Sequence, residues 1–361
     1  MELFDDAVRL SEEGFEVSPR LAKMVDDAQD RLKLFPATSA YFLPEGKPVQ
    51  AGDKLYNLEY ADTLKEFSFY GAQKFYRGVI PSNIVATVQG YADNPGLLSL
   101  SDFAEYAVKK RDPVCGPYRT YIVCSMGEPS SGGLTLLQML GMLEKFDLPK
   151  LGPDNPLSWN FIAQASALAF ADRNKYMADP DFVETPGVAL LDPEYLMSRA
   201  ALIKPDQALE TIEAGTPPQV RSEEYEDAPD VTRPGTSHIS VVDKDGNIVS
   251  MTTTIEGAFG SHMMVNGYLL NNELTDFSFI PYGEGNTPIA NRVEAGKRPR
   301  SSMAPTIVFN QSGDPVLVIG SAGGSRIIGY VLQRIIAVLD WNMPIEDSLA
   351  MPHVVARGKT V

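Results

Sequence analysis

The chain has 361 residues, of which 44% are hydrophobic and 22% are charged, a composition typical of soluble globular proteins and not of disordered or fibrous ones. Its formal net charge is −16, from 31 basic and 47 acidic residues. Such a charge repels phosphate backbones and anionic membranes, and the apolar stretches are too short or too interrupted by charge to span a bilayer. We therefore expect no nucleic-acid partner and no transmembrane helix.

The first part of the sequence has helical patterns and no pattern typical of a targeting segment. The first residues, "MELFDDAVRLSEEGF", place acidic residues where a secretion signal has a basic start, so we expect no export signal in this chain. Residues 2–15 and 18–35 have helical patterns, and Ser18 and Pro19 suit the N-cap and first turn of the second helix. Further helices are predicted at 63–78, 82–92, 132–146 and 158–177.

One strand interrupts these helices, at residues 118–126, and it leads into the loop "GEPSSGG". Cys115 and Cys124 flank "GPYRTYIV" and can face each other only across a tight bend. A disulfide is possible but not indicated by the sequence, and we expect free core thiols. The three histidines, His238, His262 and His353, form no CxxC-like or HxxxH pair. We therefore expect neither a metal nor a cofactor.

The pattern changes to strands in the second half of the chain. Residues 204–235 accumulate proline and acidic residues without an apolar period, which predicts a long exposed segment. Strands are then predicted at 236–243, 247–255, 267–274, 304–309 and 315–320, followed by a long helix from about residue 326. No internal repeat of solenoid length is present.

The first two of these strands form a predicted hairpin around Asp245-Gly246, which supplies the positive φ of a tight turn. With the turn centred on Asp245, Thr236 pairs with Thr254. The alternation of strand side chains then separates two faces. The apolar face consists of Ile239, Val241, Val249 and Met251, and the hydroxyl face consists of Thr236, His238, Ser240, Ser250, Thr252 and Thr254. A hydroxyl-rich face can be no more than the solvated side of a sheet.

The position of Thr236 favours a functional interpretation. Thr236 directly follows the segment that ends in Pro234-Gly235, where a cut would leave the sheet intact and give Thr236 a free amine. An N-terminal threonine holds nucleophile and base together, because its hydroxyl attacks an acyl carbon while its α-amine, with a pKa near neutrality, takes the proton. Thr254, across the strand pair, can orient the Thr236 hydroxyl.

A glycine-rich loop supports the same chemistry. "VLVIGSAGGSRIIGY" runs from a strand through a loop into a helix, and it matches neither a Walker A loop nor GxGxxG. It can be a plain tight turn. Alternatively, the backbone N–H groups of Gly323 and Gly324, near a helix start, can hold a developing oxyanion during acyl transfer.

Seven sequence motifs together resemble the gamma-glutamyltransferase family, also called gamma-glutamyl transpeptidase or glutathione hydrolase. They are "FYRG", "PSSGG", "FADRNKYMADP", "TSHISVVDKDGNIVSMTTTIEGAFGS", "LLNNELTDFS", "KRPRSSMAPTIVF" and "GSAGGSRII". The resemblance covers essentially the whole chain. It implies an α+β fold, the four-layer αββα sandwich of the N-terminal nucleophile hydrolases, made as one precursor that cleaves itself into two subunits.

The resemblance assigns the cut to the bond between Gly235 and Thr236. Residues 1–235 would then be the large-subunit part, mostly helical, and residues 236–361 the sheet-rich small-subunit part, the two forming one αββα domain as a heterodimer of cleavage products. The implied reaction is hydrolysis or transfer of the γ-glutamyl group of glutathione and related compounds to water, amino acids or peptides.

The resemblance also implies roles for individual residues. Thr236 is the expected nucleophile, supported by Thr254, with Gly323 and Gly324 as the oxyanion hole. The residues expected to bind substrate are Glu256, Glu273 and Asp276 at the α-amino group and Ser301 and Ser302 at the α-carboxylate. His238 is expected to be structural. Residues 277–300 can form a mobile cover over the pocket or an ordinary surface loop.

Two departures from the family pattern are expected to matter. A carboxylate-binding arginine in an "FRE"-like context, which precedes this region in the family, is not found, and small-subunit sheet that follows in the family is not found after "AMPHVVARGKTV". The chain therefore resembles a family member truncated at both ends. Full-length members are commonly exported, which suggests a periplasmic or secreted location.

Two alternatives stay open on the sequence alone. One is a relative with the same nucleophile and another pocket, similar to cephalosporin acylases or polyglutamate-processing enzymes. The other is a non-catalytic fragment or binding module that keeps the fold.

Overall fold

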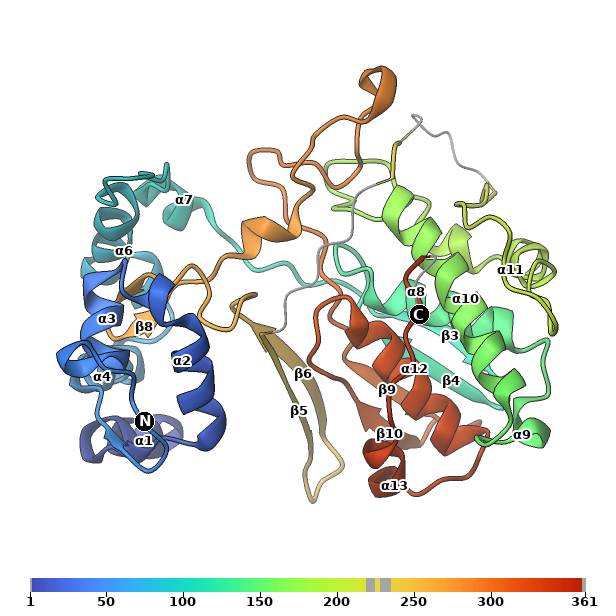
Figure 1. Cartoon of the computed structure of the whole chain (residues 1–361), viewed down its shortest axis with the longest axis horizontal. Helices are drawn as coiled ribbons and strands as arrows, with labels where there is room; N and C mark the ends of the chain where they lie inside the picture. The colour runs from blue at the N-terminus through green and yellow to red at the C-terminus, as the bar shows by residue number, and fades with distance from the viewer. Residues whose placement is uncertain (1, 219–224, 228–234, 359–361) are drawn as a thin grey trace. The chain divides into compact units, whose positions relative to one another are not determined.

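The computed structural model of the chain describes residues 2–218, 225–227 and 235–358. The chain divides into two compact units, the first made of Met1–Lys110 and Gly257–Asn272 and the second of Arg111–Glu256 and Glu273–Val361 (Figure 1). The boundaries of these units do not coincide with the predicted division at Gly235-Thr236. That division is a predicted cleavage site and stays a prediction. No helix in the described part of the chain has the length and apolar character needed to cross a membrane.

The first unit is mainly helical. Its elements are α1 (Glu2–Glu13), β1 (Phe15–Glu16), α2 (Pro19–Leu32), α3 (Pro36–Phe42), η1 (Pro44–Gly46), β2 (Lys54–Leu55), α4 (Leu58–Tyr70), α5 (Gln73–Tyr76), α6 (Val79–Gln89), α7 (Leu100–Glu105), β7 (Met264–Val265) and β8 (Tyr268–Leu269). The predicted cap of α2 is confirmed, because the Ser18 hydroxyl accepts from the Leu21 N–H at 3.1 Å.

Two predicted elements of this unit differ from the structure. The helix predicted at 63–78 is two helices, since Gly71 between them has φ +75° and ends α4. The strand predicted at 267–274 is reduced to Tyr268–Leu269, which pairs with Met264–Val265.

The second unit contains the larger sheet and the hairpin. Its elements are β3 (Val114–Tyr118), β4 (Tyr121–Ser125), α8 (Gly132–Leu143), α9 (Leu148–Leu151), α10 (Pro156–Tyr176), η2 (Gly187–Leu191), α11 (Pro193–Ala200), β5 (Thr236–Val242), β6 (Ile248–Thr254), η3 (Glu273–Asp276), η4 (Glu284–Asn286), β9 (Thr306–Phe309), β10 (Pro315–Ile319), α12 (Arg326–Leu339) and α13 (Ile345–Ala350). Four strands form an antiparallel sheet in the order β10-β9-β4-β3. Figure 1 shows α8, α10 and α12 gathered beside this sheet.

The core of the second unit lies between these helices and the sheet. It joins Val123 of β4, Val308 of β9 and Leu317 of β10 to apolar side chains from the three helices. Helix α8 is buried on nearly every side, which explains why its sequence is apolar without a polar stripe. Because α8 begins at Gly132, directly after the "PSS" loop, this packing fixes the loop that reaches the site described below.

The expectation that Cys115 and Cys124 are free thiols is wrong. They form a disulfide, because β3 and β4 make a hairpin in which Cys115 lies directly opposite Cys124, with 4.1 Å between their Cα atoms. The strand predicted at 118–126 is confirmed only over Tyr121–Ser125, and its partner Val114–Tyr118 was not predicted. The tight bend at Arg119, with φ +54°, brings the two strands together.

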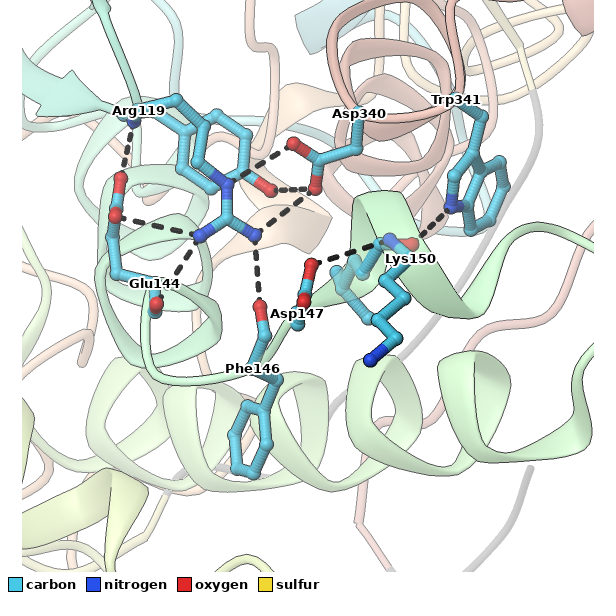
Figure 2. A network of polar contacts seen from close by, with 9 residues as sticks. Arg119, Glu144, Phe146, Asp147, Lys150, Asp340 and Trp341 are labelled. Atoms are coloured by element: carbon cyan, nitrogen blue, oxygen red, sulfur yellow. Dashed lines mark hydrogen bonds and ion pairs between the residues drawn. The ribbon is translucent and has the colours of Figure 1, made fainter.

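A network of polar contacts holds this bend against two helix ends (Figure 2). Arg119 donates through Nε and Nη2 to the two carboxylate oxygens of Asp340, at 3.1 and 3.2 Å, just after the end of α12. It also donates to the carbonyls of Glu144 and Phe146, which follow α8. The Tyr118 hydroxyl donates to Asp340 at 2.5 Å, and the Asp340 side chain is fully buried.

The β5–β6 hairpin has the predicted register. Thr236 pairs with Thr254, Ile239 with Met251 and Val241 with Val249. The orientation of its two faces is less usual. The apolar-face side chains Ile239, Val241, Val249 and Met251 are 45–51% exposed. Residues of the hydroxyl face approach β10, where the hydroxyls of Ser240 and Ser250 donate to the carbonyls of Val318 and Ile319, each at 3.3 Å.

The segment predicted to be long and exposed, 204–235, lies partly outside the described residues. Its described part lacks helices and strands, as predicted, but it is not uniformly exposed. Tyr225 is buried, and the Gly215 carbonyl accepts from the Tyr176 hydroxyl at 2.6 Å. Irregular backbone thus packs against the rest of the unit through individual contacts, which leave no periodic signature.

Candidate active site

One cavity of the second unit brings most of the predicted site residues together. Its lining includes seven of the nine predicted residues: Thr236, Thr254, Glu256, Asp276, Ser301, Ser302 and Gly324. Glu273 and Gly323 are not in that lining, although each adjoins a segment that is. Further lining residues come from the start and end of the 277–300 loop and from α10.

The two threonines meet at the open end of the hairpin. The Thr236 hydroxyl donates to Thr254 Oγ1 at 3.4 Å, and the Glu256 backbone N–H donates to the same oxygen at 2.9 Å. Thr254 Oγ1 therefore accepts two hydrogen bonds, and the one from Thr236 orients the Thr236 hydroxyl. Glu256 is buried and has φ +69°, a strained conformation for a residue with a side chain.

The glycine-rich loop leads from β10 to the start of α12. Gly323 and Gly324 have φ +138° and +59°, conformations that favour glycine, and their carbonyls accept from the N–H groups of Arg326 and Ile327 as the helix begins. Gly324 lines the cavity with Ser325 and Ile327. The first turn of α12, whose N-terminal end carries partial positive charge, therefore lines the same cavity as the two threonines.

Two acidic side chains belong to the cavity lining, and a third is near them in the sequence and interacts with their charges. Glu256 follows β6, and Glu273 and Asp276 belong to η3. Burial raises the pKa of Glu273 to about 7, and the charges of Asp276 and Glu256 act in the same direction. Three carboxyl groups in mutual electrostatic contact favour a cationic ligand over a neutral one.

The two serines lie where the backbone of 301–303 runs beside the "PSS" loop. Ser301 forms an isolated parallel β-bridge with Ser130. The Ser301 carbonyl accepts hydrogen bonds from the N–H and the hydroxyl of Ser131, at 2.9 and 2.8 Å. Arg173, from α10, donates through Nη2 to Ser302 Oγ at 2.7 Å. This end of the cavity therefore presents hydroxyls backed by a guanidinium group.

Both ends of the 277–300 loop are tied to the cavity wall by Asn291, which is buried. Its side chain donates to the Asp276 carbonyl at 2.7 Å and accepts from the Arg300 N–H at 3.0 Å. Phe279 and Ile280 line the cavity and are 63% and 48% exposed. The predicted mobile cover stays a prediction, and the structure adds that the loop's base is fixed.

His238 has the contacts expected of a structural residue. Its Nδ1 and Nε2 lie 2.8 and 3.0 Å from the hydroxyls of Thr252 and Ser240, and burial lowers its pKa. In contrast, the sequence interpretation gave no role to Arg173 or Asn291. In the sequence, Arg173 lies in the polar run Asp172–Lys175 near the end of α10, so no apolar pattern marks it as a buried residue.

Comparison with known proteins assigns the chain to one family. A family described as gamma-glutamyltranspeptidase matches residues 1–360. The chain is 36% identical to a glutathione hydrolase proenzyme of Bacillus subtilis strain 168, over 98% of this chain and 60% of that protein. It is 34% identical to an acylase ACY 1 proenzyme of Pseudomonas sp. strain SE83, over 99% of this chain and 60% of that protein.

A solved structure has the same fold over nearly the whole chain. The cephalosporin acylase from Bacillus halodurans matches with a TM-score of 0.82 and 27% identity, over 96% of this chain and 60% of that one. The predicted fold class, α+β of the N-terminal nucleophile hydrolase type, is thereby confirmed. The chain spans about 60% of the length of these relatives.

Proposed function

Because this chain belongs to the gamma-glutamyltranspeptidase family, we propose that it carries the catalytic residues of an enzyme that hydrolyses and transfers γ-glutamyl groups. The observation that supports this most directly is one cavity whose lining includes Thr236 and Thr254, with their hydroxyls 3.4 Å apart, together with Gly324, Ser301 and Ser302. Glutathione is the proposed donor, and water, amino acids or peptides are the proposed acceptors.

The first proposed step is self-cleavage. In the uncleaved chain the nitrogen of Thr236 belongs to the Gly235-Thr236 peptide bond. The Thr236 hydroxyl attacks the Gly235 carbonyl, the C–N bond breaks as the nitrogen takes a proton, and an ester joins Gly235 to Thr236 Oγ1. Water hydrolyses this ester, which leaves the Gly235 carboxylate and a free α-amine on Thr236. The two products stay together as a heterodimer.

The second proposed step uses the new amine as a base. Thr236 Oγ1 attacks the γ-carbonyl of the donor, the α-amine takes the hydroxyl proton, and the backbone N–H groups of Gly323 and Gly324 stabilise the oxyanion. The amine leaving group departs with a proton, leaving a γ-glutamyl ester on Thr236. Water or an acceptor amine then attacks this ester, regenerates the Thr236 hydroxyl and releases glutamate or a new γ-glutamyl compound.

The charge distribution of the cavity supports a γ-glutamyl donor. Glu256, Glu273 and Asp276 complement an α-ammonium group, and Ser301 and Ser302 donate to an α-carboxylate. An acyl group that lacks the ammonium would not add this charge interaction to its binding.

Mass spectrometry and N-terminal sequencing of the purified chain after incubation test the proposal. We expect two polypeptides, one beginning at Thr236, and hydrolysis of γ-glutamyl-p-nitroanilide. Thr236→Ala should abolish both, and Thr254→Ala should slow both by about 100-fold or more, the range for loss of a group that directs proton transfer. Ser237→Ala, on the exposed neighbour of Thr236, is the matched control and should change neither.

Two results would contradict the proposal. Cleavage that persists in Thr236→Ala would exclude Thr236 as the nucleophile. A folded wild-type chain that stays in one piece would instead favour the non-catalytic alternative.

An acylase is the second candidate, favoured by the likeness to a cephalosporin acylase over 96% of the chain. A glutaryl-p-nitroanilide donor, which keeps the carboxylate and lacks the ammonium, distinguishes the two functions. Faster hydrolysis of the glutaryl compound than of the γ-glutamyl compound would favour the acylase. We expect the opposite order.

A further inference from the structure

Arg173 connects the two segments that form the serine end of the cavity. Resting on the proposed function, we propose that Arg173 is a positioning residue that turns the Ser302 hydroxyl into a hydrogen-bond donor and thereby makes the enzyme select donors that carry an α-carboxylate. Arg173 is 3% exposed and lines the cavity. It comes from α10, 129 residues away from Ser302 in the sequence.

The direction of the hydrogen bonds carries the argument. A guanidinium group can only donate, so Ser302 Oγ accepts from Arg173 Nη2. A serine hydroxyl has a single proton, and this arrangement leaves that proton to point away from Arg173. Ser301 is set in the same way, because its Oγ accepts from the Met303 N–H at 3.1 Å. The pair therefore offers two O–H donors, which suit an anionic group.

Arg173 also fixes where this pair lies. Its Nε donates to Ser131 Oγ at 2.8 Å, and the Ser131 hydroxyl donates onward to the Ser301 carbonyl. One planar guanidinium thus holds Ser302 directly and Ser301 through one intermediate. A lysine cannot reproduce two contacts of fixed geometry from a single nitrogen.

The surroundings of the guanidinium restrict its position. It lies over the ring of Phe170, 5.4 Å from the ring centre, and its Nη1 donates to Asn174 at 2.9 Å. The backbone carbonyl of Arg173 accepts from Arg300 Nη1 at 2.9 Å, so a second cation stands beside the same end of the cavity. The cavity lining thus contains two cations, Arg173 and Arg300, as well as the carboxylates of Glu256 and Asp276. This combination of charges fits a zwitterionic donor.

Kinetics with two donors test this inference. γ-Glutamyl-p-nitroanilide carries both the ammonium and the carboxylate, whereas 4-aminobutyryl-p-nitroanilide lacks only the carboxylate. For Arg173→Gln we expect KM for the γ-glutamyl donor to rise about 10- to 100-fold, the range for charge-assisted hydrogen bonds, with kcat changed much less. For the 4-aminobutyryl donor KM should not change, and Arg173→Lys should give a smaller rise than Arg173→Gln.

A double substitution separates positioning from a structural role. Ser302→Ala should raise KM for the γ-glutamyl donor to a similar extent, and Arg173→Gln/Ser302→Ala should show no further loss, because both act through one contact. Arg199→Lys is the matched control, since Arg199 is 6% exposed, donates to the carbonyls of Leu168 and Glu213, and lies outside the cavity lining. It should leave the ratio of the two KM values unchanged.

The outcomes distinguish this inference from the proposed function. If the wild type hydrolyses the γ-glutamyl donor but Arg173→Gln raises KM equally for both donors, or not at all, the inference fails and the function stands. If the wild type does not hydrolyse it, calorimetric binding of L-glutamate and 4-aminobutyrate decides. Loss of L-glutamate binding alone in Arg173→Gln supports the inference without the function, and absence of wild-type binding to both ligands overturns it.

Discussion

At the scale of single residues, the surroundings of Glu273 oppose its ionisation. Burial raises its pKa to about 7, and Asp276 and Glu256 add to the effect, so near neutral pH the group changes charge. A bound ammonium would stabilise the ionised form that these neighbours disfavour. Under the proposed function, we therefore expect donor binding to depend on pH through this carboxyl.

We expect KM for γ-glutamyl-p-nitroanilide to fall about tenfold between pH 6 and pH 8, since a group of pKa about 7 goes from mostly protonated to mostly ionised over this range. Steady-state kinetics across this range, with Glu273→Gln as the comparison, check this. The variant should show a flat KM, and a wild-type KM that rises with pH would contradict the interpretation.

The same pKa shift predicts a stability effect of known sign. Because the pKa of Glu273 is raised in the folded state, its stabilising contribution is present below its ordinary pKa of 4.5 and is lost as the pH rises towards 7. Glu273→Gln cannot ionise, so its melting temperature should exceed that of the wild type at pH 8 and not at pH 4.5.

At the scale of elements, the sequence predicted what depends on local pattern and missed what depends on distant partners. The register of β5–β6 followed from Asp245-Gly246 and alternation, and all seven pairs are observed. Strand β3, which contains Cys115, was not predicted because Gly116 and Pro117 weaken its strand signal. Without this strand, nothing in the sequence indicated that Cys115 pairs with Cys124. The contact of Arg173 with Ser302 joins a helix to a loop, which no periodicity in either segment can indicate.

The bend between β3 and β4 gives the element-scale prediction. Arg119→Ala leaves the Asp340 carboxylate, which is fully buried, with the Tyr118 hydroxyl but without its cationic partner. We expect the free energy of unfolding to fall by about 3 kcal/mol, the lower end of the range for breaking a buried ion pair. Denaturant unfolding in a Thr236→Ala background, which avoids cleavage, measures it.

A matched control tests whether burial is the cause. Lys244 and Asp245 also form an ion pair, but both side chains are largely exposed at the hairpin turn. Lys244→Ala should change the free energy of unfolding by less than about 0.5 kcal/mol. Equal losses in the two variants would show that the network in Figure 2 contributes no more than a surface pair.

At the scale of the whole molecule, the fold class was predictable and the compact units were not. Helices followed by strands indicate an α+β chain, and the motifs from residue 75 to residue 328 give the family. The first unit, however, takes Gly257–Asn272 from between residues of the second, and this segment carries no break in composition. Sequence reasoning predicts a cleavage boundary from the chemistry of Thr236, whereas the units are defined by which residues contact one another.

Charge and exposed apolar surface together govern association of the chain. The net charge of −16 keeps molecules apart at pH 7, and the sequence pI is about 4.7. As the pH falls towards 4.7 this repulsion vanishes, while the apolar face of the hairpin, 45–51% exposed, can contact other molecules. We expect light scattering to show unassociated molecules at pH 7.5 and association near pH 4.7.

Two variants test the part played by the hairpin. Val241→Thr/Val249→Thr keeps β-branched residues in the strands and should shift the onset of association to lower pH. Val108→Thr, at an exposed valine outside the hairpin, should not shift it. Association that is unchanged in the hairpin variant would assign it to loss of charge alone.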